Sequence, residues 1–445
     1  MKAWSLQISK HTALITPTIC LNASALQRIT QQRLPESLKR VGLLIHDPAL
    51  FSLWLLTLDG HASRVLLIPP SLTSDEQKQF CQQAQIETII TDRTDQPLPY
   101  PVLDASFLLT TEHLPEAGSR PQLTEWILCT SGTTSVPKMV RYTRTQLTAT
   151  LHRVDSPYLR WGLLYDASRF AGLQVILQAL LADTGLVTPM PDQPLRAIVK
   201  LFARHQVNAL SATPTLWRKL IMLPETRRLP LNQITLGGEI ANQLLLDQLR
   251  QMFPQAHITH IYASTEAGVG FSVKDGREGF PRQWLTHPPP GIALRIAPDG
   301  ELFIRSSRKS LGYLHAPHSS QEWIATGDKV YIAGDRVRFA GRKNGAINVG
   351  GNKVMPETIE QILLQHPQVR EVLVRARANP ITGALVEAIV VPVHTRSSNQ
   401  LLKEELVQLC QQHLPRYAIP AFIRFVDALP TTSSGKLCRA YEAAT

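Results

Sequence analysis

Cysteine is scarce in this sequence, and long apolar runs are missing. The 445 residues include five cysteines, and none of them has the C-x-x-C or histidine-paired spacing of a zinc site. This cysteine usage is typical of a reducing compartment. No stretch of 18 uninterrupted apolar residues occurs, and the N-terminus lacks the continuous apolar core of a signal peptide. The sequence therefore predicts a soluble, cytoplasmic protein with no membrane partner and no zinc site.

Runs of basic residues are also missing, although the net charge is +11. The sequence has 46 Lys and Arg against 35 Asp and Glu, and no run of five basic residues occurs. A nucleic-acid-binding surface usually concentrates such residues in a patch or carries a known binding motif. We therefore expect no nucleic-acid partner. A positive field over a site for a polyanionic small molecule accounts for the excess of basic residues.

Apolar segments of strand length alternate with segments of helical pattern along most of the chain. Thr73 is a typical N-cap residue and precedes one of these helical segments. Strands are predicted at 41–47, 64–69, 87–92, 185–187, 207–211 and 233–237, and helices at 73–85, 173–181, 195–205 and 216–223. Strands that alternate with helices predict an α/β layered domain with a largely parallel sheet.

The pattern changes twice toward the C-terminus. Short β segments follow residue 291, and residues 341–345 form a flexible, charged link. About 100 residues behind this link show their own strand–helix alternation, which indicates a separate small domain. We expect a large N-terminal domain over 1–341, shortened at its start, with layered sheets and helices plus a β-rich subdomain. A small, mobile α+β domain would cover 342–445.

One loop of small and hydroxylated residues follows the apolar run 126–129. It consists of Thr130, Ser131, Gly132, Thr133, Thr134, Ser135, Val136, Pro137 and Lys138. Backbone N–H groups and hydroxyls of such a loop can face an anion, and the lysine adds positive charge. The spacing does not match G-x-x-x-x-G-K-[ST], which excludes the common P-loop. On its own the loop is compatible with a phosphate site and with a solvated turn.

Four further polar stretches stand out. Residues 237–239, Gly-Gly-Glu, have the shape of a glycine turn and an acidic cap after a strand. Residues 262–266, Tyr-Ala-Ser-Thr-Glu, follow an apolar segment, and ligands of α/β sheets commonly bind at strand ends. Residues 326–328, Thr-Gly-Asp, offer a carboxylate on a tight turn, and Lys436 stands at the tip of a mobile loop. Each stretch alone is equally compatible with a hairpin turn, a surface loop or a solvated charge.

Together, and in this order, the five stretches resemble the motifs of the adenylate-forming superfamily. This superfamily includes acyl- and aryl-CoA synthetases, luciferases and the adenylation domains of nonribosomal peptide synthetases. The resemblance covers nearly the whole chain, from about residue 41 to residue 439. The loop follows the pattern Thr-Ser-Gly-Thr-Thr-Gly-x-Pro-Lys-Gly, but Ser135 and Met139 replace two of its glycines. Asn344 lies at the hinge position, where Asp or Lys is usual.

The resemblance implies an ATP-dependent reaction in two steps. A carboxylate attacks the α-phosphate of ATP-Mg²⁺, which gives an acyl-adenylate and pyrophosphate, and a thiol then attacks the activated carbonyl. It also implies ATP- and acid-binding residues in 1–341 and a catalytic lysine in 342–445. The β- and γ-phosphates would be held by Thr130, Ser131, Gly132, Thr133, Thr134 and Lys138. The other implied roles are Thr265 at the α-phosphate, Glu266 at the magnesium, Gly238, Glu239 and Tyr262 around adenine, Asp328 and Arg342 at the ribose, Asn344 at the hinge, and Lys436 between carboxylate and phosphate oxygens.

The resemblance places the acid pocket at Asp166, Phe170, Ser211 and Gly237. Residues 165–168 look like the peptide-synthetase segment whose aspartate receives an α-ammonium, whereas residues 348–360 are closer to CoA synthetases. Asp166 is therefore either a helix cap or solvated acid, or a partner for a substrate amine or hydroxyl. Arg169 would bind a second carboxylate or neutralise Asp166.

The sequence thus predicts a stand-alone, AMP-forming acid:thiol ligase. Its substrate would be an aryl or small carboxylic acid, amino acids included, and its acceptor either CoA or the phosphopantetheine arm of a free-standing carrier protein. Two alternatives stay open. Ser135 and Met139 motivate a catalytically weak nucleotide-binding relative, and the other alternative is an adenylating enzyme whose intermediate is not captured by a thiol.

Overall fold

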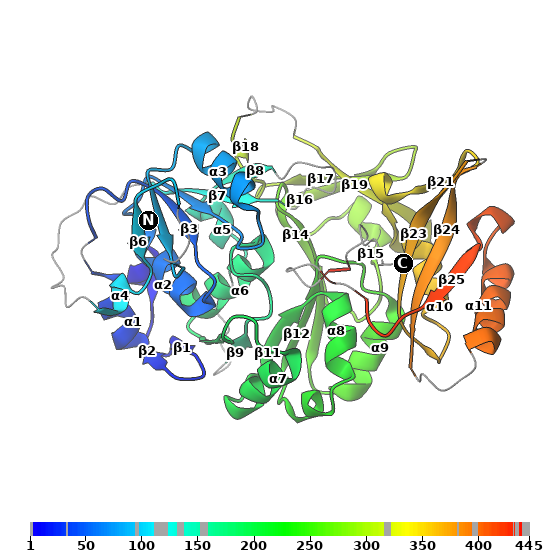
Figure 1. Cartoon of the computed structure of the whole chain (residues 1–445), viewed down its shortest axis with the longest axis horizontal. Helices are drawn as coiled ribbons and strands as arrows, with labels where there is room; N and C mark the ends of the chain where they lie inside the picture. Colours follow the sequence, from blue (N-terminus) through cyan, green and yellow to red (C-terminus); the bar gives the residue numbers. More distant parts are fainter. Residues whose placement is uncertain are drawn as a thin grey trace.

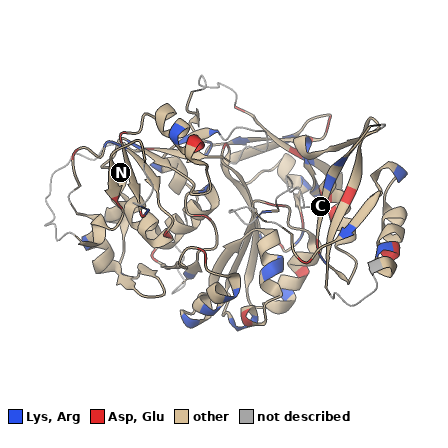
Figure 2. Cartoon of the chain, in the orientation of Figure 1, with Lys and Arg blue, Asp and Glu red and all other residues tan. Residues whose placement is uncertain are grey.

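The computed structural model places the strands that it describes in four sheets (Figure 1). The described residues are 3–32, 34–93, 98–110, 123–130, 138–151, 159–315, 322–380, 382–393, 399–429, 431 and 436–437. Figure 1 shows an elongated molecule in which the beginning of the chain (blue) and the last sheet (orange) lie at opposite ends. Among the described residues, no helix is long and apolar enough to cross a bilayer. Lys and Arg are spread over both halves of the molecule, as the sequence predicts (Figure 2).

A seven-stranded sheet near the beginning of the chain has the order β18-β8-β7-β4-β3-β5-β6. Its five consecutive strands from β7 to β6 are parallel, whereas β8 and β18 are antiparallel to their neighbours. Helix α3 begins with the predicted cap, because Thr73 and Glu76 form a capping box. The strands are β3 (Arg40–Leu44), β4 (Arg64–Leu67), β5 (Thr88–Thr91), β6 (Val102–Asp104), β7 (Glu125–Cys129), β8 (Met139–Thr143) and β18 (Gly312–Tyr313). The helices and short turns of this part are η1 (Trp4–Gln7), α1 (Ala23–Thr30), α2 (Pro48–Leu58), α3 (Ser74–Gln83), α4 (Phe107–Thr110) and α5 (Arg144–Thr148).

An eight-stranded sheet has the order β14-β13-β12-β11-β9-β10-β1-β2. All its strands except the edge strands β14 and β2 are parallel, which confirms the predicted α/β architecture. One apolar core, which includes Leu55, Trp126 and Leu177, joins this sheet to the seven-stranded one. The strands are β1 (Ala13–Ile15), β2 (Cys20–Asn22), β9 (Arg160–Gly162), β10 (Gly185–Val187), β11 (Ala209–Ala212), β12 (Gln233–Gly237), β13 (His257–Ser264) and β14 (Gly268–Val273). The helices are α6 (Phe170–Leu181), α7 (Leu195–Arg204), α8 (Pro214–Ile221), η2 (Pro224–Arg228) and α9 (Gln243–Met252).

A third, antiparallel sheet corresponds to the predicted β-rich region. It consists of β15 (Phe280–Pro281), β16 (Ile292–Ile296), β17 (Glu301–Ser306), β19 (Ile324–Ala333) and β20 (Arg336–Arg342), with η3 (Arg282–Leu285) beside it. The expected tight turn at 326–328 is wrong, because these residues lie inside β19. Gly327 has a φ of +72°, and the pairing of β17 with β19 shifts register nearby. A glycine in the left-handed region permits this irregularity within a strand.

The last sheet has its own helices and its own apolar core. Strands β22, β21, β24 and β23 are neighbours, and β25 pairs with β24. Ile359, Leu363 and Leu406 belong to the core of this sheet. The elements are β21 (Ile347–Val349), β22 (Asn352–Val354), α10 (Pro356–Leu363), β23 (Val369–Asn379), β24 (Gly383–Pro392), α11 (Asn399–His413), η5 (Arg416–Ala418) and β25 (Phe422–Phe425). The domain boundary at residue 341 stays a prediction.

The segment before this sheet differs from the flexible link that the sequence predicts. Strand β20 continues to Arg342, and Lys343–Gly345 form a short 3-10 helix, η4, which contains Asn344. The Lys343 ammonium lies 2.6 Å from a carboxylate oxygen of Glu301 in β17. The segment is therefore tied to the third sheet by an ion pair that local composition does not indicate.

Helix α8 is anchored on the eight-stranded sheet by Trp217, which yields a prediction about stability. Trp217 is fully buried, and its Nε1 donates to the carbonyl of Thr235 in β12 at 2.9 Å. The substitution Trp217→Phe removes this bond, so we expect the free energy of unfolding to fall by about 1–3 kcal/mol in urea denaturation. The control is Trp323→Phe, which keeps an aromatic ring under Arg295 and Arg305. If Trp323→Phe lowered the free energy of unfolding as much as Trp217→Phe does, the anchoring role of Trp217 would be contradicted.

Candidate active site

The ends of the predicted phosphate loop are held together by hydrogen bonds. The N–H of Thr130 donates to the carbonyl of Lys138 at 2.8 Å, and the N–H of Lys138 donates to Oγ1 of Thr130 at 3.2 Å. The Lys138 ammonium lies 5.0 Å from the centroid of the Tyr313 ring. Residues 131–137 between these ends lie outside the described residues, and they include four predicted phosphate-binding residues, Ser131, Gly132, Thr133 and Thr134, as well as Ser135.

Met139, where relatives carry glycine, belongs to the apolar core. It is the first residue of β8 and pairs with Cys129 of β7. Its side chain is 5% exposed and packs in the cluster that contains Leu66 and Phe80. Because strand side chains alternate between the two faces of a sheet, a side chain here enters the core. This departure from the family pattern is therefore accommodated by packing.

The Thr265–Glu266 turn is held by two tyrosines. The hydroxyl of Tyr142 donates to the carbonyl of Thr265 at 2.6 Å, and the hydroxyl of Tyr313 donates to Oε1 of Glu266 at 3.1 Å. Burial raises the pKa of Tyr142, and burial together with the Glu266 charge raises the pKa of Tyr313 to about 12. Both phenols therefore stay protonated as donors. Tyr313 is a site residue that sequence reasoning missed, since it reaches this place through the pairing of β18 with β8.

The donor set around Glu266 fits a magnesium ion that arrives with ATP. The described residues contain no cluster of three or more His, Cys, Asp or Glu arranged for a metal. Proteins commonly hold Mg²⁺ through one or two carboxylates and the phosphates of the substrate. Glu266 would supply the single carboxylate, and its Oε1 is already oriented by the Tyr313 hydroxyl.

Tyr262, Asp328 and Arg342 form a hydrogen-bonded set on β13, β19 and β20. The hydroxyl of Tyr262 donates to Oδ2 of Asp328 at 2.5 Å, and Nε of Arg342 lies 2.9 Å from Oδ1. The Tyr262 ring stacks on Phe271 and Phe339, with centroid distances of 5.0 and 5.2 Å. Burial raises the pKa of Asp328, and the Arg342 charge opposes this shift. The structure thus brings together Tyr262, which the sequence predicts at the adenine, with Asp328 and Arg342, which it predicts at the ribose.

Lys436 lies against the glycine element of the eight-stranded sheet. Gly238 has a φ of +80°, and a Cβ placed on it would be 3.0 Å from Cε and 3.5 Å from Nζ of Lys436. Burial lowers the pKa of Lys436, while the charges of Glu239 and Asp328 oppose this shift. Arg342 and Arg169 are also close enough to lower it. The predicted catalytic lysine therefore reaches the predicted nucleotide site.

Glu239 does not cap the helix that follows it, contrary to the expectation from the sequence. Helix α9 is capped by Asn242, whose side chain accepts from the N–H of Leu245 at 3.1 Å. Glu239 instead accepts the N–H of Thr215, in the first turn of α8, at 2.9 Å. The acidic cap therefore acts on a different helix, because β11 and β12 are neighbours and the exits of both strands meet at one edge.

The residues that the sequence predicts around the acid lie in β11 and β12 and in the segment that leads from β9 into α6. Asp166 accepts the N–H and the hydroxyl of Ser168 at 2.9 and 2.6 Å, and Nε of Arg169 lies 3.8 Å from its other oxygen. Phe170 begins α6, and its ring lies 5.7 Å from that of Tyr142. Asp166 is thus engaged by its own turn, and Arg169 also donates to the carbonyl of Cys129 at 3.1 Å.

Tyr165 adds an aromatic hydroxyl beside Ser211 and Gly237. A Cβ placed on Gly237 would be 3.9 Å from the Tyr165 oxygen. Burial raises the pKa of Tyr165, and a hydrogen bond with Ser211 opposes this shift. Ser211 is 7% exposed and lies in β11. The phenol therefore stays neutral and lies where the predicted acid would bind.

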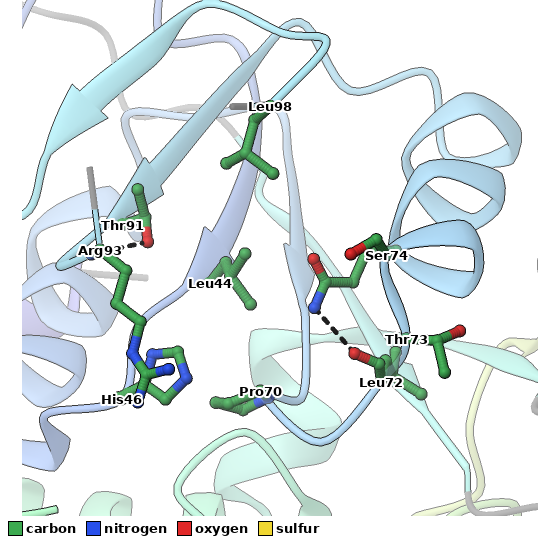
Figure 3. Close-up of a pocket in the computed structure, with 10 residues that line it drawn as sticks. Leu44, His46, Pro70, Leu72, Thr73, Ser74, Thr91, Arg93 and Leu98 are labelled. Carbon is green, nitrogen blue, oxygen red and sulfur yellow. Dashed lines mark hydrogen bonds between the residues drawn. The ribbon is translucent and has the colours of Figure 1, made fainter. Parts of the chain in front are cut away.

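A separate cavity of about 210 Å³ lies at the carboxyl ends of β3, β4 and β5 (Figure 3). None of the predicted site residues lines it; His46 and Arg93 are its basic members, and Thr73, Ser74 and Thr91 supply hydroxyls. Nδ1 of His46 lies 3.2 Å from Oδ1 of Asp92. The cavity lies at the same sheet edge as the exit of β7, where the predicted phosphate loop begins.

Two family models match the chain. The AMP-binding enzyme model matches residues 39–314, and the model of the AMP-binding enzyme C-terminal domain matches residues 358–436. The chain belongs to the AMP-binding enzyme family. This membership confirms the resemblance that the motifs indicate.

Relatives within this family share moderate sequence identity with the chain. Oxalate–CoA ligase of Saccharomyces cerevisiae is 26% identical over 340 residues, which cover 70% of this chain and 61% of that protein. The 2-succinylbenzoate–CoA ligase of Bacillus pumilus is 25% identical over 462 residues, which cover 94% and 90%. The match spans between 10% and 61% of the length of the first curated relatives.

Solved structures of the family share the fold. NpsA of Klebsiella oxytoca, in complex with 3-hydroxyanthranilyl-AMSN, superposes with a TM-score of 0.80 at 20% identity and covers 98% of this chain and 96% of its own. This likeness concerns the arrangement of elements over nearly the entire chain. The predicted fold class is therefore confirmed.

The contact between Gly238 and Lys436 predicts a measurable change in local exchange. The substitution Gly238→Ala places a Cβ 3.0 Å from Cε of Lys436 at a φ of +80°. We expect the amide of Leu437 to exchange with deuterium about fivefold faster, since crowding of the new Cβ against Cε of Lys436 at a cost of about 1 kcal/mol weakens the docked segment. The matched control is Gly334→Ala, which has a φ of +61° and no atom within 4 Å. Equal deuterium exchange of the Leu437 amide in the two variants would contradict the contact between Gly238 and Lys436.

Proposed function

We propose that this family member is an AMP-forming acid:thiol ligase that activates an aryl or small carboxylic acid with ATP. The observation that carries the proposal is the position of Lys436, whose side chain lies against Gly238. Arg342 and Asp328 act on the same ammonium electrostatically. A cation from the last part of the chain thus stands beside the residues that the family resemblance assigns to ATP.

In the first step, a carboxylate oxygen of the acid attacks the α-phosphorus, and the bond to pyrophosphate breaks. Catalysis of such a transfer rests mainly on alignment and on neutralising charge. The Lys436 ammonium would neutralise charge that builds up between the acid and the phosphate. Lys138 and Arg342 would hold the ends of the nucleotide, and Thr265 would contact the α-phosphate. Bound with ATP, Mg²⁺ would neutralise phosphate charge, with Glu266 as its carboxylate.

In the second step, a thiol attacks the acyl carbonyl, AMP leaves, and the thiol proton passes to solvent. The names of the relatives as CoA ligases support CoA as the acceptor. The phosphopantetheine arm of a carrier protein has the same thiol chemistry and remains the alternative acceptor. Mg²⁺ and ATP complete the set of small molecules that the proposal requires.

An aryl acid is the preferred substrate for two reasons. Tyr165 and Phe170 supply rings at the predicted acid pocket, and aromatic rings stack favourably on one another. In addition, 2-succinylbenzoate is named in a relative that the chain matches over 94% of its length. The engagement of Asp166 by Ser168 and Arg169 argues against a substrate ammonium at this carboxylate, and Asp166 does not cap α6, whose N-cap is Arg169 without a side-chain hydrogen bond.

A pyrophosphate-exchange assay across a panel of aryl and small acids tests the proposal. We expect ATP–pyrophosphate exchange with at least one aryl acid. The substitution Lys436→Ala should reduce this exchange by about 10²- to 10³-fold, because it removes a positioned charge donor. The control Lys403→Ala removes an exposed lysine of α11 in the same part of the chain and should leave exchange within twofold.

The contrary outcomes separate the alternatives. Tight ATP binding without exchange for any acid would identify a nucleotide-binding relative without adenylation activity. Exchange without thioester formation, either with CoA or with a phosphopantetheinylated carrier protein, would identify an adenylating enzyme without a thiol acceptor. Exchange that survives Lys436→Ala would refute the catalytic role of this lysine.

A further inference from the structure

The carboxylate of Glu239 joins two distant parts of the chain. Its Oε1 accepts the N–H of Leu437, the residue after Lys436, at 3.1 Å. Its Oε2 accepts the N–H of Thr215, in the first turn of α8, at 2.9 Å. Both oxygens are thus occupied by backbone donors, and Thr215 is only 2% exposed. One side chain therefore links the lysine segment to the first turn of α8.

Charges on both sides reinforce the position of Glu239. Glu239 opposes the lowering of the Lys436 pKa that burial causes. On α8, burial lowers the pKa of Arg218, and Glu239 is the carboxylate that most strongly opposes that shift, followed by Glu360 and Glu371. A carboxylate between two cations, with hydrogen bonds to both oxygens, has little freedom to reorient.

A second contact of the lysine segment with α8 is weaker. Nζ of Lys219 lies 3.5 Å from Oγ1 of Thr431, and this bond is exposed to solvent. Thr431 forms a β-bridge with Leu437, so the two ends of the segment are paired. An exposed contact at that distance contributes little. The hydrogen bond from Leu437 to Glu239 is therefore shorter and less exposed than the contact of Thr431 with Lys219.

Helix α8 starts directly after the turn that forms part of the predicted acid pocket. Ser211 is the third residue of β11, which ends at Ala212. Thr213 follows directly and caps α8 through its hydroxyl. Glu239 binds the N–H of Thr215, two residues after this cap. The lysine segment is thereby attached to the same turn that would contact the acid.

We propose that Glu239 is a positioning residue that holds Lys436 over the site by fastening the lysine segment to the acid-pocket turn of α8. This inference rests on the proposed function for its catalytic consequence. It departs from the role that the family resemblance implies, in which Glu239 frames the adenine. The two roles predict different kinetics, because a positioning residue acts on the chemical step and an adenine contact acts on ATP binding.

The decisive variant is Glu239→Gln, which keeps the size of the side chain and replaces one acceptor oxygen by a donor. We expect the kcat of ATP–pyrophosphate exchange to fall about tenfold to a hundredfold, with less than a threefold change in the KM for ATP. Thioester formation from supplied acyl-adenylate should lose far less than adenylation does, since Lys436 is assigned to the first step only. The matched control is Glu76→Gln, which removes a carboxylate acceptor at the start of α3 and should leave exchange within twofold.

The pH profile supplies a readout that a purely structural role would not change. Adenylation should decline as pH rises through the pKa of Lys436, which lies below its usual value because of burial. Asp328 and Glu239 raise this pKa, whereas Arg342 and Arg169 lower it. Removing the Glu239 charge should therefore move the alkaline decline to lower pH. The control Glu76→Gln should keep the wild-type profile.

Hydrogen exchange tests the inference independently of any acid. In Glu239→Gln a single oxygen is left for the N–H groups of Leu437 and Thr215, so at least one of these two amides should exchange with deuterium at least about tenfold faster than in wild type or Glu76→Gln. Unchanged hydrogen exchange would overturn the inference, as would a rise in the KM for ATP without a fall in the kcat of ATP–pyrophosphate exchange. If the wild-type protein adenylates none of the acids but Glu239→Gln still speeds hydrogen exchange, the proposed function fails and the fastening role of Glu239 stands.

Discussion

The parallel strands of two sheets impose the constraint on which the site depends. Because neighbouring parallel strands end at the same edge, residues far apart in sequence leave the sheet side by side. β9, β11, β12 and β13 deliver the predicted acid-pocket residues, the glycine element and the Thr265–Glu266 turn to one edge. The exit of β7, where Thr130 lies, belongs to the seven-stranded sheet, and one apolar core joins that sheet to the eight-stranded one. The segment that follows the last sheet contributes one side chain to this edge, that of Lys436.

Charge compensation organises this edge. Each acidic side chain is oriented by specific donors: Asp328 by Tyr262 and Arg342, Glu266 by Tyr313, and Glu239 by two backbone N–H groups. Lys436 and Arg342 stand among them, and fixed carboxylates lie next to both cations. Such a preorganised arrangement suits a triphosphate, because little reorganisation is needed when its charge arrives.

Local signals in the sequence predicted the α/β alternation, the Thr73 cap and the order of the motifs, and the structure confirms these. Predictions failed where pairing between distant strands decides the outcome. Thr326–Asp328 have a turn-like composition, but the pairing of β19 with β17 and β20 holds them in a strand. Tyr313 is ordinary in its own neighbourhood and gains its place only through β8. Met139 departs from a motif, yet the alternation of β8 turns its side chain into the core.

The separation of Glu239 from Leu437, 198 residues along the chain, has a consequence for synthesis. A ribosome releases the eight-stranded sheet long before Lys436 is made, and N-terminal domains generally fold first during translation. A nascent or truncated chain can therefore complete its nucleotide-binding edge while it lacks the lysine. Only a chain translated past residue 436 brings Lys436 to Gly238, so the lysine joins this edge after the strands that form it have been synthesised.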